Sequence, residues 1–262
     1  MKDLMQHFRP EEQSFITHLL TMIEEVRQQY APKLTGFLDP RQVMIAQSII
    51  GENGDVKVAS EGVFQQAERK RLLLFPDYYE PTREDFDLVC YELRYPSKFI
   101  QLKHPDVLGS ILAIGLERSK FGDIRVDDKK IQFIVAAEVS NYVRANLTAI
   151  NKVKVNLTDV TSNEDFILSE DHWVEQFDTV SSLRLDTVLA SALKISRQKS
   201  SLLIQSGHVK VNFRLTENSS FEVGEADLLS IRGFGRLSIK SIEGRTKKDK
   251  IRIIFSKLER KS

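Results

Sequence analysis

Basic side chains in the C-terminal third carry the clearest chemical signal in this sequence. Arg197, Gln198 and Lys199 directly follow Ser196, a residue type that commonly caps a helix, so we expect them in a first helical turn. Backbone N–H groups are unpaired there and attract anions. A guanidinium, such as that of Arg184, can also donate two hydrogen bonds to one phosphate. These residues therefore predict a phosphate-binding face.

The distribution of charge supports this prediction. The 262-residue chain has 38 basic and 37 acidic residues, a net charge of +1. Residues 181–262 contain 17 basic and 8 acidic residues, or +9, which leaves −8 for residues 1–180. The near-neutral total thus conceals an acidic body and a basic C-terminal third. That combination indicates a polyanion-binding module attached to another part.

Catalytic chemistry is weakly represented. The five histidines are scattered without metal-ligand spacing, and the single cysteine, Cys90, lies in an apolar stretch that favours a core position. No phosphate loop or dinucleotide-binding fingerprint occurs. One cysteine excludes a disulfide framework and fits a reducing cytosol, and no run approaches the roughly 18 apolar residues of a membrane span. We expect a cytoplasmic, non-enzymatic protein without a cofactor or metal.

Residues 182–262 are predicted to fold into the module that positions the basic side chains. Leu185–Leu193 and Arg197–Gln205 have the apolar spacing of two short helices, and Gly207 follows where a left-handed residue is expected. Strands are predicted at residues 209–211 and 228–231, with a closing hairpin of residues 237–242 and 250–255. The stretch Arg232–Arg236 is predicted to be a glycine-punctuated basic loop.

The segment before this module is predicted to be an acidic linker over residues 161–181. Residues 156–183 contain seven acidic side chains and no Lys or Arg. Trp173 and Phe177 are expected to pin part of the linker to a neighbouring domain.

Residues 81–160 are predicted to form a ferredoxin-like domain. Strand-like runs at 86–94, 124–126, 130–136 and 153–160 alternate with helical patterns at 104–117 and 137–146, which gives the order βαββαβ. RNA-recognition domains share this order, but their aromatic signature is reduced here to Phe133. The sequence therefore leaves open whether this domain contacts RNA.

Residues 1–80 are predicted to form a small α/β unit. An amphipathic helix follows Pro10 and runs to Tyr30, a second helix follows its cap Asp39, and strand-like runs occupy residues 56–59 and 71–75. The whole chain is thus predicted to be a multidomain α+β protein.

The motifs of the basic module resemble the ribosomal protein S-four-type RNA-binding domain, also called the alpha-L motif. They cover about residues 182–245 and comprise Arg184–Asp186, Ser196–Lys199, Ile204–Asn212 and Gly224–Asp227. Most of the chain resembles the YlmH family of bacterial RNA-binding proteins, through residues 108–118, 121–124 and 232–236 and, in the first 80 residues, 37–40 and 68–71.

This resemblance implies a site and a function. Two packed helices would present Arg184, Arg197, Gln198 and Lys199 to structured RNA, and Lys210 and Asn212 would continue that face. Asp186 would orient or cap locally. Separately from the resemblance, Arg232–Arg236 imitates the start of the RNA-recognition signature, but we interpret it as a basic loop in which Arg232 and Arg236 contact backbone phosphates. The family is associated with the large ribosomal subunit and with peptidyl-tRNA on stalled ribosomes, in translation quality control, and it is also linked to cell division.

Two alternatives remain at this point. Arg184-Leu185-Asp186 also resembles the catalytic-aspartate motif of pseudouridine synthases, but only 76 residues follow Asp186, and the module uses most of them. An RNA-modifying enzyme would need an active site within residues 1–160, where we identify no catalytic set. A cell-division adaptor with secondary RNA binding is the other alternative.

Overall fold

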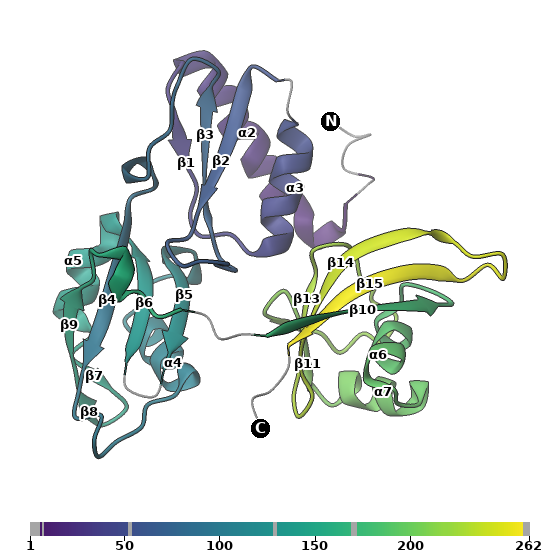
Figure 1. The fold of residues 1–262 in the computed structure, drawn as a ribbon. Helices are drawn as coiled ribbons and strands as arrows, with labels where there is room; N and C mark the ends of the chain where they lie inside the picture. Colours follow the sequence, from purple (N-terminus) through teal and green to yellow (C-terminus); the bar gives the residue numbers. More distant parts are fainter. Residues whose placement is uncertain (1–5, 7, 52–53, 128–129, 169–171, 259–262) are drawn as a thin grey trace. The chain divides into compact units, whose positions relative to one another are not determined.

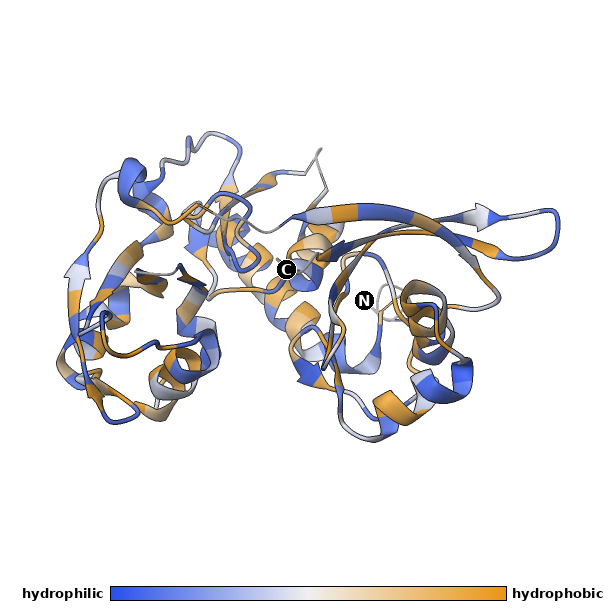
Figure 2. Ribbon diagram, turned by 60° about the horizontal axis from the view of Figure 1, so that its bottom comes forward, coloured by the Kyte–Doolittle hydropathy of each residue, from blue (hydrophilic) through white to orange (hydrophobic). Residues whose placement is uncertain are grey.

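The protein divides into two compact units, each with its own hydrophobic core. The computed structural model describes residues 6, 8–51, 54–127, 130–168 and 172–258, and the units are Met1–Ser169 and Glu170–Ser262 (Figure 1). Hydrophobic and hydrophilic residues alternate along the helices and strands of both units, as the hydropathy colouring shows (Figure 2). Among the described residues, no helix is long and apolar enough to cross a membrane.

The first unit begins with two helices packed on a small antiparallel sheet of order β1-β3-β2. Its elements are η1 (Pro10–Glu12), α2 (Gln13–Gln29), β1 (Lys33–Leu34), α3 (Pro40–Ile50), β2 (Val56–Glu61) and β3 (Arg71–Pro76). Asp39 caps α3 as predicted, because its carboxylate accepts a hydrogen bond from the Gln42 backbone at 2.9 Å. The two helices and two strands predicted for this region are confirmed.

The same unit continues into a four-stranded antiparallel sheet of order β5-β6-β4-β9, which is the ferredoxin-like arrangement predicted from the sequence. Its elements are η2 (Glu84–Phe86), β4 (Leu88–Arg94), α4 (His104–Ala113), η3 (Arg118–Lys120), β5 (Phe121–Val126), β6 (Ile131–Ala136), α5 (Ala137–Asn146), β7 (Ala149–Ile150), β8 (Val153–Lys154), β9 (Asn156–Asp159) and η4 (Asn163–Asp165). The predicted last strand is divided at Val155, which turns into the core after the β7–β8 hairpin.

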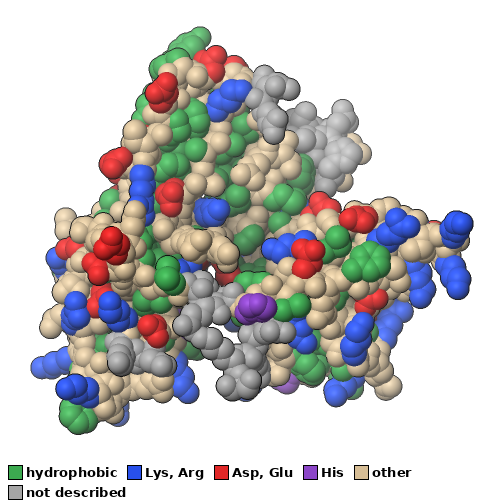
Figure 3. Space-filling model, viewed as in Figure 1, with side chains coloured by type: hydrophobic (Ala, Val, Ile, Leu, Met, Phe, Trp, Pro, Cys, Tyr) green, Lys and Arg blue, Asp and Glu red, His purple; other side chains and the backbone are tan. Residues whose placement is uncertain are grey.

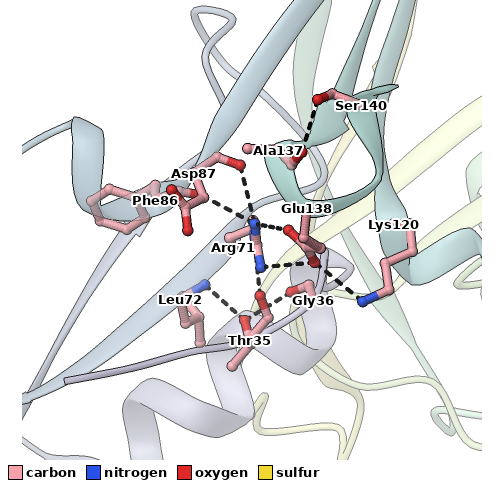
Figure 4. A network of polar contacts seen from close by, with 10 residues as sticks. All are labelled: Thr35, Gly36, Arg71, Leu72, Phe86, Asp87, Lys120, Ala137, Glu138 and Ser140. Carbon is pink, nitrogen blue, oxygen red and sulfur yellow. Dashed lines mark hydrogen bonds and ion pairs between the residues drawn. The ribbon is translucent and has the colours of Figure 1, made fainter. Parts of the chain in front are cut away.

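Buried arginines join the two halves of the first unit. The Arg71 guanidinium donates to the carbonyl oxygens of Thr35 (2.7 Å), Phe86 (3.3 Å) and Asp87 (3.1 Å). It also forms an ion pair with Glu138 of α5 at 3.2 Å (Figure 4). One side chain of β3 thereby satisfies backbone acceptors from both halves.

A second set of contacts at this junction uses Arg69. Its Nη2 donates to the Phe37 carbonyl at 2.7 Å and its Nε to the Phe121 carbonyl at 3.2 Å, while its backbone N–H donates to Asp123 at 3.1 Å. A Cβ on Gly122 would lie 2.8 Å from the Phe37 ring, so glycine permits this close approach. The motifs at 37–40, 68–71 and 121–124 therefore meet at a structural junction.

The second unit packs two short helices on one face of an antiparallel sheet of order β10-β15-β14-β13-β11-β12. Its elements are β10 (Trp173–Val180), α6 (Leu185–Leu193), α7 (Arg197–Gln205), β11 (Val209–Val211), β12 (Arg214–Leu215), β13 (Leu228–Ile231), β14 (Gly235–Arg245) and β15 (Ile251–Leu258). The predicted helices, strands and hairpin are confirmed, and Gly207 has a φ of +69° as expected.

Two predictions about this region were wrong. Residues 173–180 belong to no linker: they form β10 and pair along its whole length with β15. Its acidic side chains fit a strand because Glu175 is exposed and Asp178 accepts hydrogen bonds from Ser191 and Lys194 of the helical region. The loop Arg232–Arg236 is also shorter than predicted, since Gly235 and Arg236 already open β14.

Candidate nucleic-acid interface

Local sequence signals fix the two helices that carry the predicted site. The Ser196 hydroxyl accepts a hydrogen bond from the Lys199 backbone at 3.2 Å, so it caps α7 as predicted. Buried residues of both helices, Leu189 and Ile204 among them, lie in the core against the sheet. The first turn of α7 is therefore held in place by packing and by its cap.

One buried carboxylate organises two arginines. Asp186, which is 3% exposed, accepts hydrogen bonds from Arg184 Nε (3.2 Å) and Nη2 (3.1 Å) and from Arg197 Nε (3.0 Å) and Nη2 (3.4 Å). Burial raises the pKa of Asp186, but these hydrogen bonds outweigh it and hold that pKa below its ordinary value. The expectation that Asp186 orients its neighbours is thereby confirmed, and both guanidiniums share one negative charge.

This arrangement leaves each arginine suited to a further ligand. Both guanidiniums direct Nε and Nη2 to Asp186, which leaves Nη1 directed away from the carboxylate. The side chains of Arg184 and Arg197 are 38% and 56% exposed. Gln198 and Lys199 are exposed in the same first turn of α7. We call Arg184, Arg197, Gln198 and Lys199 the helical face.

Lys210 does not continue the helical face. Its neighbours in β11, Val209 and Val211, are buried in the core beneath the helices, so Lys210 points to the opposite side of the sheet. There it pairs in register with Ser230, which pairs with Arg236. The structure therefore separates the predicted residues into two groups on opposite faces of one sheet.

Asn212 has a role inside the fold. Its side-chain amide donates to Asp227 at 2.8 Å, and its carbonyl oxygen accepts from the Leu228 backbone at 2.9 Å. Its φ of +48° places it at the turn after β11. The amide that was predicted to contact RNA thus holds two turns together, and we remove Asn212 from the candidate site.

The two remaining predicted residues lie at or beside the β13–β14 turn. Arg232 is exposed, and its backbone N–H donates to the His208 carbonyl at 2.9 Å. Arg236 lies over the Trp173 ring, with 6.0 Å between its guanidinium carbon and the ring centroid. This contact was missed from the sequence because Trp173 was assigned to a linker.

The ferredoxin-like sheet offers no open face of the kind that RNA-recognition domains use. On its non-helical side, Cys90 and Ile134 are buried in a cluster with Phe37 and Phe64 from the N-terminal half. Phe133 is fully buried on the helical side. Burial accordingly raises the pKa of the Cys90 thiol to about 12.

The segment after β9 covers a further part of that face. Buried Gln132 donates from its side-chain amide to the Asp165 carbonyl at 2.9 Å, and its oxygen accepts from the Ile167 backbone at 2.8 Å. The central residues of this face are therefore covered by other parts of the same unit. Within the described ranges, no group of three or more His, Cys, Asp or Glu residues is placed to hold a metal ion.

Comparisons with known proteins agree with this organisation. Residues 11–79 match the family described as "YlmH, N-terminal", residues 81–164 match "Putative RNA-binding domain in YlmH", and residues 183–229 match "S4 domain". Among solved structures, "Cell division protein ylmH from Streptococcus pneumoniae" is similar, with 31% identity and a TM-score of 0.54 over 62% of this chain and 98% of that chain.

A curated relative matches over almost the full length of both proteins. It is "Ribosome-associated protein quality control protein P2" of Bacillus subtilis (strain 168), 45% identical over 257 residues, which cover 98% of this chain and 99% of the relative. The chain belongs to the YlmH family and contains an S4 domain.

Proposed function

We propose that this protein is a non-enzymatic, cytoplasmic RNA-binding protein that docks on structured RNA of the large ribosomal subunit and on peptidyl-tRNA, in translation quality control. The observation that carries the proposal is the pair of arginines held on Asp186 beside the first turn of α7. The name of the Bacillus subtilis relative supports the ribosomal assignment.

The physics of the helical face suits a folded RNA. Double-stranded RNA is recognised mainly through its shape, its phosphates and its 2′-hydroxyl groups, so a rigid set of cations is sufficient. Asp186 fixes two guanidiniums before the RNA arrives, which reduces the conformational entropy that binding would otherwise cost. Each phosphate that is neutralised releases counterions, so binding should weaken steeply as salt increases.

The test uses the full chain with Arg197→Ala/Lys199→Ala. Arg184 is retained, because removing both arginines would leave the buried Asp186 carboxylate unpaired and would destabilise the unit. We expect the affinity for isolated large ribosomal subunits to fall at least about tenfold at constant salt. The slope of log affinity against log salt should also decrease by about 2.

A matched control removes the same charge from the first unit. Lys33→Ala/Lys57→Ala changes two lysines on β1 and β2 and should leave both affinity and salt slope unchanged. Equal affinities for Arg197→Ala/Lys199→Ala and the unchanged protein would overturn the assignment of the helical face. Mass spectrometry of nucleosides after incubation with total RNA tests the non-enzymatic assignment, since a modified nucleoside would contradict it.

A role as an adaptor in cell division is the second candidate, favoured by the name of the solved Streptococcus pneumoniae relative. Pull-downs with and without nuclease separate the two functions. Division proteins that stay bound after RNA is digested would support the adaptor, whereas partners lost with the RNA would support the first proposal.

A further inference from the structure

The first unit contains a domain whose family description names RNA, yet its sheet face is closed. Residues 81–164 match "Putative RNA-binding domain in YlmH", while Cys90, Gln132 and Ile134 on the non-helical face are buried. An RNA contact on this domain therefore needs a different surface with positive charge and accessible apolar groups.

One end of the ferredoxin-like domain has both properties. The loop from β4 to α4 and the β7–β8 hairpin carry six exposed residues that we call the basic end: Arg94, Lys98, Phe99, Lys103, Lys152 and Lys154. Residues 94–103 and 146–158 contain no Asp or Glu, although residues 1–180 carry a net charge of −8. The neighbouring carboxylate of Glu92 pairs with Arg94 at 3.0 Å, so the proposal rests on the lysines. Figure 3 shows Lys and Arg side chains gathered at the end of this unit where β7 and β8 lie.

Hydrogen bonds and a shared core hold the two segments of the basic end together. The Asp106 carboxylate of α4 accepts hydrogen bonds from the Lys103 backbone at 2.9 Å and from Asn151 Nδ2 at 3.0 Å. Leu102 and Ile150 are buried in the same core cluster. The loop and the hairpin are thus anchored to one helix and one core, so their lysines lie on a defined surface.

Phe99 distinguishes this end from an ordinary solvated charge cluster. It is 87% exposed, more than any other large hydrophobic residue among those described. An exposed aromatic ring on a loop that also carries lysines offers a stacking surface for an unpaired base, with cations of the same loop for the flanking phosphates. Aromatic stacking of this kind is a common means of recognising single-stranded loops and ends of RNA.

We propose that the basic end is a second RNA-binding surface, in which Phe99 stacks on an unpaired base and Lys98, Lys103, Lys152 and Lys154 contact the neighbouring phosphates. It rests on the proposed function for its ligand class, but it uses residues of the other unit. The RNA it binds must contain unpaired nucleotides, which a blunt duplex lacks.

Two variants of the full chain test the surface, with two RNA probes. The probes are a tRNA transcript, which has unpaired loops and a single-stranded 3′ end, and a blunt RNA duplex of about 20 base pairs, long enough for a domain that reads duplex shape. Phe99→Ala should weaken binding of the tRNA about tenfold and leave binding of the duplex unchanged. Lys152→Ala/Lys154→Ala should weaken tRNA binding and lower its salt slope by about 2.

The controls are matched in residue type. Tyr78→Ala removes another exposed aromatic ring of the same unit, and Lys33→Ala/Lys57→Ala removes two lysines distant in sequence from the basic end. Every substituted side chain at the basic end is exposed, so unchanged circular dichroism and melting temperature should accompany the loss of binding.

The outcome distinguishes this proposal from the proposed function. If Phe99→Ala binds tRNA as tightly as the unchanged protein, or loses tRNA and duplex equally, base stacking at the basic end is overturned. If Lys152→Ala/Lys154→Ala keeps its affinity while Arg197→Ala/Lys199→Ala loses it, the second surface fails and the helical face stands. If no variant loses affinity, both assignments fail.

Discussion

Arginines serve opposite purposes in the two units. At the junction of the first unit, Arg71 and Arg69 are buried, and backbone carbonyl oxygens accept most of their hydrogen bonds. On the helical face of the second unit, Arg184 and Arg197 stay exposed and share the buried carboxylate of Asp186. We call an arginine structural when its N–H groups donate to acceptors inside the fold, as those of Arg71 do. An arginine can bind a ligand when a carboxylate orients it and some of its N–H groups face solvent.

The electrostatics of the two regions differ accordingly. At the junction, burial lowers the pKa of Arg69 and lowers that of Arg118 to about 10. On the helical face, hydrogen bonds to Asp186 raise the pKa of Arg184. The buried guanidiniums at the junction offset their cost of desolvation by donating hydrogen bonds to buried carbonyl oxygens. The guanidiniums of the helical face stay exposed to a partner.

The largest effect we expect is the loss of stability that follows from removing the structural arginine Arg71. Arg71→Ala would leave the carbonyl oxygens of Thr35, Phe86 and Asp87 buried without this donor, which should lower the unfolding free energy of the first unit by about 3 kcal/mol or more. The chain has a single tryptophan, Trp173, in the second unit. Urea unfolding should therefore shift when followed by circular dichroism but much less when followed by tryptophan fluorescence.

An exposed arginine of the first unit provides the control for this comparison. Arg27→Ala removes ion pairs with Glu24 and Asp55 at the surface, and we expect little change in either transition. If Arg71→Ala lowers the unfolding free energy of the first unit no more than Arg27→Ala does, the division into structural and ligand-binding arginines is contradicted.

The next effect concerns the residue that orients the binding arginines. Asp186→Asn raises the net charge by one, which by itself favours RNA, but it removes the carboxylate that fixes Arg184 and Arg197. Because each mobile side chain must then be ordered on binding, we expect the affinity for large ribosomal subunits to fall about tenfold. The salt slope should stay nearly constant, since the phosphate-contacting cations remain. Tighter binding by Asp186→Asn would show that net charge outweighs orientation.

Local signals in the sequence were sufficient for much of the fold. The cap at Asp39, the cap at Ser196 and the apolar spacing of α2 each depend on residues within one or two turns, and each is observed. The ferredoxin-like order followed from the alternation of helical and strand periods. The proximity of Arg184 and Arg197 was expected from the resemblance to the S-four-type domain and not from local signals, and both side chains contact Asp186.

The errors arose where a side chain's role depends on a distant partner. β10 was missed because its acidic residues are typical of a linker. Its partner strand, β15, also lies more than 70 residues later in the chain. Lys210 was placed on the helical face because the sequence does not say which side of β11 the helices cover. Asn212 carried an RNA-binding pattern, but its side-chain amide donates to Asp227 and accepts from the Leu228 backbone, which gives it a role inside the fold.

The smallest effect we expect is a difference in how the two regions respond to acid. Burial opposes ionisation of Asp186, but hydrogen bonds from Arg184 and Arg197 hold its pKa below 3.8. Its ionised form therefore stabilises the folded second unit above pH 3.8, and this stabilisation is lost as pH falls through the folded pKa. The difference in unfolding free energy between the unchanged protein and Asp186→Asn, followed by Trp173 fluorescence, should be constant near neutral pH and shrink toward zero below about pH 4.

The junction should respond with the opposite sign. Burial and the neighbouring Glu68 raise the pKa of Asp123, against the backbone hydrogen bonds that it accepts from Glu68 and Arg69. A carboxyl group whose pKa is raised on folding stabilises the folded state at pH values below its ordinary pKa. This stabilisation is lost as the pH rises through the folded-state pKa. As the pH falls, the second unit should therefore lose the contribution of Asp186 to its unfolding free energy. The first unit should gain the contribution of Asp123. The unfolding free energies of Asp186→Asn and of the unchanged protein should therefore converge at pH values well below 3.8. If they still differ there as much as at neutral pH, the Asp186 carboxylate does not hold the arginines through its charge.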